Sequence, residues 1–192
     1  MQLPYTTKTK VLITGMVTLF IFSMLLWEHF HGGVASHHLL AQDNLPAVSN
    51  WWGGLLLPVL SWLLLGSIEK RIRKQSPESL LTSRQVRRML GLFISGLVFA
   101  ISIAVSFTHE YHLFLDNVVY LFFFLSLIIP IYYGEFILGF ILGMAYTFGA
   151  ILPTIFILLL AVIGLLIYRF IRPLIIKLSR TFSNNPVKSA NP

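Results

Sequence analysis

Long runs of apolar residues constrain the fold of this chain more than any other feature of its sequence. The runs cover Val11–Trp27, Trp51–Ile68, Leu90–Phe107, Val118–Tyr133 and Phe136–Tyr168. Most are close to the length of about 20 residues that an α-helix needs to cross a hydrocarbon core of about 30 Å. Charged residues make up only 11% of the 192 residues, against about 25% in soluble domains. The sequence therefore predicts a polytopic membrane protein and argues against an ordinary soluble enzyme.

The last apolar run is too long for one membrane span. As a single helix, Phe136–Tyr168 would be about 50 Å long at a rise of about 1.5 Å per residue. Pro153, which follows Gly149, is the expected turn, because proline ends a helical hydrogen-bond ladder and glycine tolerates turn dihedrals. We therefore expect an all-α bundle of six transmembrane helices with short loops. The expected spans cover residues 11–28, 51–68, 89–107, 114–133, 135–151 and 153–171.

These helices are expected to form a single transmembrane domain over residues 1–182. The first apolar stretch exceeds the length of about 7–15 residues that is usual in a signal peptide, so we expect it to stay as a span. Residues 183–192 are polar and are predicted to form a disordered cytoplasmic tail. Gly139 and Gly143 form a small-xxx-small pair, which predicts close helix packing. Gly53 and Gly54 are also expected to serve packing, and room for a ligand beside the histidines is the alternative.

Basic residues are confined to one side of the predicted bundle. All 14 lysines and arginines lie before the first helix, between the second and third helices, or after the sixth. Cytoplasmic loops of membrane proteins carry an excess of Lys and Arg. Both termini are therefore predicted to be cytoplasmic, in a multi-pass protein of the plasma (inner) membrane. The expected partner is the lipid bilayer and not a nucleic acid, while the oligomeric state is left open.

The opposite, outer face is expected to collect all histidines of the chain. They are His29, His31, His37, His38, His109 and His112, and four acids accompany them: Glu28, Asp43, Glu110 and Asp116. The preference for cytoplasmic cations explains why this face lacks Lys and Arg, but it does not explain the histidines. Scattered interfacial polar residues are the simplest interpretation, and a shared site is the other.

Spacing within this outer set suggests metal ligation. His109, His112 and Asp116 are spaced i, i+3, i+7, which on a helix places them on one face. His37 and His38 from the first outer loop would complete the coordination sphere. Imidazole nitrogens and carboxylate oxygens bind zinc, non-haem iron and manganese, and zinc is favoured here. Further candidate ligands at the end of the first helix are Glu28, His29 and His31.

A metal at the outer interface would activate water for hydrolysis. The predicted function is metal-dependent hydrolysis of a lipid or another amphiphile, with Asp43 and Glu110 as candidate catalytic groups that move the proton. One alternative is a divalent-metal channel or carrier whose outer vestibule is the His/Asp cluster. Another is a haem-binding protein, or a pH-sensing protein in which the histidines bind protons without a metal.

Replacement of His112 tests the metal prediction. We expect His112→Ala to lower the metal content of the purified protein by more than the roughly 10–100-fold that is typical of changes around a ligand. Its stability should change by no more than about 0.5 kcal/mol, as for other surface substitutions. Metal analysis and thermal unfolding of wild type, His112→Ala and the control His31→Ala give the comparison. Unchanged metal content in His112→Ala, or none in the wild type, would favour a cluster without metal.

Overall fold

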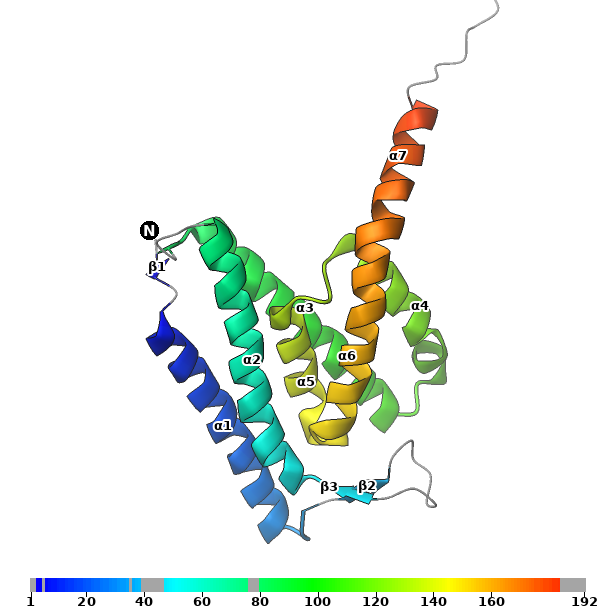
Figure 1. Ribbon diagram of the computed structural model, residues 1–192. Helices are drawn as coiled ribbons and strands as arrows, with labels where there is room; N and C mark the ends of the chain where they lie inside the picture. Colours follow the sequence, from blue (N-terminus) through cyan, green and yellow to red (C-terminus); the bar gives the residue numbers. More distant parts are fainter. Residues whose placement is uncertain (1–2, 5, 35, 39–46, 76–79, 184–192) are drawn as a thin grey trace, which may run out of the picture.

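The computed structural model describes residues 3–4, 6–34, 36–38, 47–75 and 80–183 (Figure 1). Apart from two short strand pairs, the described chain is helical. The helices are α1 (Thr7–Phe30), α2 (Trp51–Gln75), α3 (Ser83–Thr108), α4 (His112–Ile128), α5 (Gly134–Phe148), α6 (Ile151–Leu166) and α7 (Arg172–Ser183). A π-helical turn, η2 (Ile167–Ile171), joins α6 to α7 without a break. The predicted all-α helical bundle is therefore confirmed.

Four of the helices are long and apolar enough to cross a membrane. They are α1, α2, α3 and the continuous helix over Ile151–Ser179. The other two are shorter: α4 has 17 residues and α5 has 15. The predicted span over residues 114–133 runs five residues past α4, which ends at Ile128, two residues before Pro130. The apolar helices support a multi-pass membrane protein.

The chain reverses inside the last apolar run as predicted, but the turn lies at Gly149 and not at Pro153. Gly149 has a φ of 70°, a left-handed conformation that favours glycine. Pro153 instead lies in the first turn of α6, where its missing N–H group would have no helical acceptor. The predicted tail over residues 183–192 lies outside the described residues, except for Ser183, which ends α7.

The bundle has two chemically different ends. At one end, strand β1 (Leu3–Pro4) pairs with β4 (Leu80–Leu81), so the N-terminal segment lies beside the α2–α3 connection. Figure 1 shows β1 at the upper left and α7 at the top, and the hairpin of β2 (Ser36–His38) and β3 (Ala47–Ser49) at the bottom. The described Lys and Arg residues belong to the start of α1, the end of α2, the start of α3, and η2 and α7, which we call the basic end. We call the bottom the histidine end.

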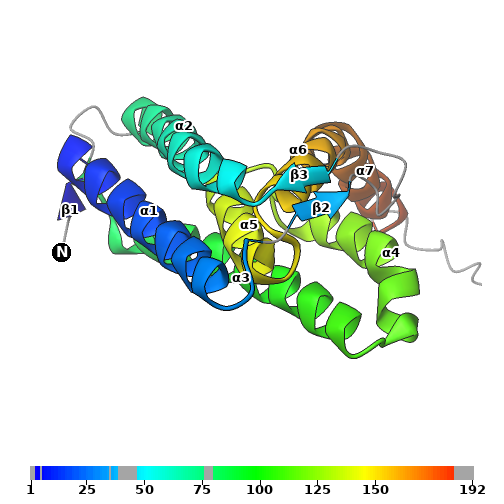
Figure 2. The same cartoon turned by 90° about the horizontal axis from the view of Figure 1, so that it is seen from below.

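Helix α5 is the centre of the bundle and packs against α2, α3 and α6. In Figure 2, α1 and α2 lie side by side on one flank of α5, and α4 lies on the other. Phe136, Phe140 and Ile141 of α5 are fully buried. An apolar helix of only 15 residues is thus enclosed by longer neighbours, which places its first turn inside the bundle.

Small residues allow α5 to approach α3 closely. A Cβ atom added at Gly139 would overlap the Phe93 carbonyl oxygen, and one added at Gly96 would overlap the Phe136 carbonyl oxygen. At Gly143 an added Cβ would lie 2.8 Å from the Leu97 carbonyl oxygen. The predicted role of the Gly139–Gly143 pair in close helix packing is confirmed.

The α3–α5 contact predicts opposite effects for two alanine substitutions. Gly139→Ala should lower the free energy of unfolding by about 1–3 kcal/mol, because the added methyl group must separate the two backbones. Gly91→Ala is the matched control on α3, since nothing lies within 4 Å of its added Cβ. It should leave stability unchanged or raise it by up to about 1 kcal/mol through helix propensity. Unfolding in detergent, followed by circular dichroism, measures both, and equal effects would contradict this packing.

Candidate functional site

At the histidine end, the described candidates His29 and His31 contact aromatic rings. The His31 ring stacks on Trp27 at a centroid distance of 3.7 Å, and its Nδ1 lies 2.9 Å from the Trp27 carbonyl oxygen. The His29 ring meets the edge of Trp51 at a centroid distance of 6.1 Å. Among the described residues, no three His, Asp or Glu side chains are close enough to hold one metal ion.

The turn between α3 and α4 separates residues that the i, i+3, i+7 pattern placed together. His109 caps the end of α3, and α4 begins only at His112. Glu110 between them has a φ of 56°, so the chain leaves the helical path there. His112 and Asp116 lie one turn apart on α4, and His109 does not share their helical face. All four of these side chains are exposed.

The remaining predicted residues, His37, His38 and Asp43, belong to the segment between α1 and α2. The backbones of His37 and His38 belong to β2, where they pair with Val48 and Ala47. Asp43 lies outside the described residues. A metal site that includes these three residues stays a prediction.

Polar and small residues at the histidine end tie the helices together. The Asn50 Nδ2 donates to Glu28 Oε2 at 3.5 Å, and Asn50 is only 5% exposed. An added Cβ at Gly53 would lie 2.9 Å from Ala150 Cβ. Glu28 therefore joins the end of α1 to the start of α2, and the packing role expected for Gly53 is confirmed.

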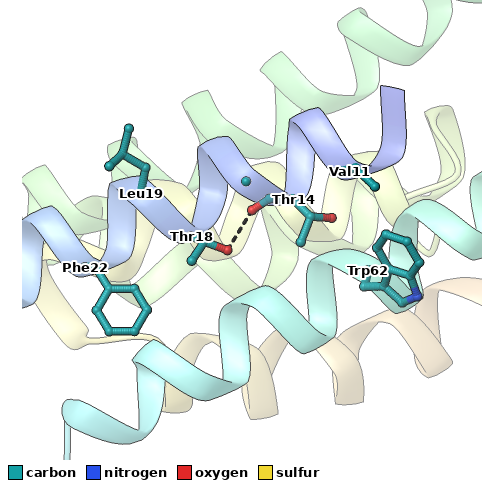
Figure 3. A pocket seen from close by; sticks show the side chains of 7 residues that line it. Val11, Thr14, Thr18, Leu19, Phe22 and Trp62 are labelled. Atoms are coloured by element: carbon teal, nitrogen blue, oxygen red, sulfur yellow. Dashed lines mark hydrogen bonds between the residues drawn. The ribbon is translucent and has the colours of Figure 1, made fainter. Parts of the chain in front are cut away.

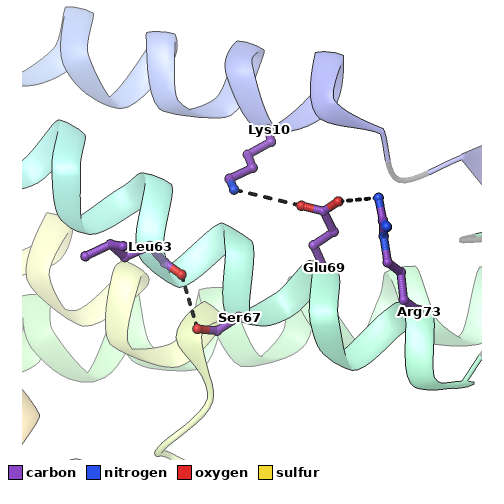
Figure 4. A network of polar contacts seen from close by, with 5 residues as sticks. All are labelled: Lys10, Leu63, Ser67, Glu69 and Arg73. Atoms are coloured by element: carbon purple, nitrogen blue, oxygen red, sulfur yellow. Dashed lines mark hydrogen bonds and ion pairs between the residues drawn. The ribbon is translucent and has the colours of Figure 1, made fainter.

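At the basic end, the carboxylates of α2 and α5 are held in ion pairs. Glu69 accepts from Arg73 at 2.9 Å, and its other oxygen lies 3.8 Å from Lys10 Nζ (Figure 4). The Lys10 ammonium also lies 4.0 Å from the centre of the Trp62 ring. This network links α1 to α2, and it uses both oxygens of Glu69.

Glu135, in the first turn of α5, has a different environment. Its Oε1 accepts from Arg71 of α2, and the Arg71 guanidinium lies 4.0 Å above the Tyr133 ring. The Glu135 side chain is only 5% exposed. Its second oxygen, Oε2, is buried and has no hydrogen-bond partner among the described residues. Glu135 therefore presents an unused acceptor inside the bundle.

Glu135 also lines a groove between α1 and α3, which we call the α1–α3 groove. Its volume is about 510 Å³, and residues of α1, α2, β4, α3 and α5 line it. Val17 and Phe20 belong to one wall, Met89 and Leu90 to the other. Among its described lining residues, Glu135 is the only one that carries a charge. The volume lies within the range of about 300–1,000 Å³ that is usual for small-molecule sites.

A second groove of about 520 Å³ lies on the other side of α1, between Val11, Phe22 and Trp62 (Figure 3). Thr14 and Thr18 also line it, and Thr18 donates its hydroxyl to the Thr14 carbonyl oxygen at 2.8 Å. None of the described residues that line this second groove is charged. The α1–α3 groove is therefore the better candidate for a specific site.

No known protein family, curated protein or solved structure matches this chain. The candidate function thus depends on the geometry of the α1–α3 groove. The sequence does carry one signal for it, because Glu135 is the acid that opens the longest apolar run. Ionisable residues within membrane helices are rare and mark functional sites.

Proposed function

We propose that this protein binds a single-chain amphiphile from the bilayer in the α1–α3 groove. The observation that carries the proposal is an apolar groove of about 510 Å³ with one buried carboxylate at its wall. Pockets that combine apolar walls with a small number of placed polar groups are typical of ligand sites. An amphiphile meets both requirements, because its chain contacts the walls and its head contacts the carboxylate.

The groove is open to the side of the bundle, where the acyl chains of a bilayer would lie. Met16, Phe20 and Leu90 line it and are 64%, 44% and 53% exposed. A ligand already dissolved in the bilayer could enter between these side chains without crossing the headgroup layer. Lateral entry favours a lipid-like ligand over a water-soluble metabolite.

Glu135 gives the groove a direction. It lies at the basic end, near Arg71, whereas Phe20 and Leu142 lie further along α1 and α5 towards the histidine end. A bound amphiphile would therefore lie along the helices, with its head at Glu135 and its chain extending towards the centre of the bundle. A lipid in the leaflet next to the basic end has the same orientation, with its head at that end and its chain towards the middle of the bilayer.

The predicted metal-dependent hydrolase would act at the other end of the molecule. Its candidate residues, including His109 and Asp116, lie near the α3–α4 turn, while the α1–α3 groove has its polar group at the basic end. The two proposals are separate, and they share only the lipid-like ligand. The metal measurement on His112→Ala tests the hydrolase.

Filling the α1–α3 groove tests the proposal. The probe is hexadecan-1-ol with a photoreactive diazirine in its chain, added to the protein in lipid nanodiscs. We expect saturable labelling of α1 and α3 peptides that line the groove. Met16→Trp should reduce this labelling at least about tenfold, which corresponds to about 1.4 kcal/mol of binding free energy.

Leu12→Trp is the matched control. Leu12 is 64% exposed on α1, as Met16 is, but it does not line the α1–α3 groove. The probe should label the Leu12→Trp variant to the same extent as the wild-type protein. Labelling that is unsaturable and equally strong on the exposed apolar face of α6, at Leu159 and Val162, would show bulk lipid contact only and would contradict the proposal.

A further inference from the structure

The unused oxygen of Glu135 restricts the chemistry of the ligand. One oxygen of this carboxylate is taken by Arg71, and the other is buried without a partner among the described residues. A buried acceptor that lacks a donor destabilises the protein, and more so when it is charged. A ligand that supplies a donor at this point would remove that cost, whereas a ligand without a donor would leave it.

Neighbouring cations already have other partners. Lys10 contacts Glu69 and Trp62, and the Arg88 guanidinium lies over the Tyr133 ring at 5.7 Å from its centre. Arg71 is shared between Glu135 Oε1 and the same ring. Among the described residues, none of these cations donates to Glu135 Oε2.

We infer that the α1–α3 groove selects amphiphiles whose head donates a hydrogen bond, a hydroxyl or an amine, to Glu135 Oε2. This inference rests on the proposed function. An ionised carboxylate only accepts hydrogen bonds, so an O–H or N–H group is the complementary partner. A head that only accepts, such as an ether, gains nothing there, and an anionic head meets a like charge.

Four amphiphiles with the same hexadecyl skeleton separate these heads. Hexadecan-1-ol, hexadecylamine, hexadecyl methyl ether and hexadecanoic acid compete with the photoreactive hexadecanol for the wild-type protein in nanodiscs. We expect the alcohol and the amine to displace the probe at concentrations at least about tenfold lower than the ether and the acid. This ratio is what one hydrogen bond to a charged group provides.

The possible outcomes separate the two proposals. Equal displacement by all four compounds would overturn the selection by Glu135 and leave the groove as an unselective chain site. If none of the four displaces the probe, the proposed function itself is wrong. Both outcomes are measured on the wild-type protein. The test therefore holds even where a substitution impairs folding.

A pair of variants adds a second readout. Glu135→Gln keeps the size of the side chain but removes the charge and adds a donor, so the advantage of the amine over the ether should fall at least about fivefold. Glu69→Gln is the matched control, because Glu69 is an ion-paired acid at the same end that does not line the groove. An unchanged head preference in Glu135→Gln would contradict the assignment to this carboxylate.

Discussion

The close approach of α3 and α5 determines how the rest of the molecule is arranged. Glycines at 96 and 139 let the two backbones meet at distances that any side chain would prevent. Because van der Waals packing drives helix association in lipid, such a contact can fix the position of a short apolar helix. It holds α5 at the centre and thereby sets the position of Glu135 relative to α1 and α2.

The charges at the basic end follow from the cost of placing ions in an apolar medium. A charge inside a membrane protein is expensive unless it has a partner. Glu69 uses both of its oxygens in ion pairs, with Lys10 and Arg73. Glu135 uses one oxygen with Arg71, its other oxygen has no partner among the described residues, and the residue lines a groove with apolar walls. This difference between two neighbouring acids is the reason to assign a ligand to one and not to the other.

Local patterns in the sequence predict much of the fold. Apolar runs predict the helices, the distribution of Lys and Arg predicts a basic end, and the Gly139–Gly143 pair predicts a close contact. Features that depend on tertiary geometry are not predictable in this way. The groove exists because α1 packs on α2 while α3 packs on α5, which no run of residues encodes by itself. Likewise, the turn at Glu110 removes His109 from the helical face that spacing alone suggests.

The most direct measurement is an experimental structure of the protein in lipid nanodiscs with hexadecan-1-ol. We expect an elongated ligand between α1 and α3, with its hydroxyl within about 2.5–3.0 Å of Glu135 Oε2, the usual range for such hydrogen bonds. Helices α1 and α3 should keep their separation along the groove. A groove closed by contact of α1 with α3, or filled by a second copy of the chain while the alcohol lies elsewhere, would contradict the proposed amphiphile site.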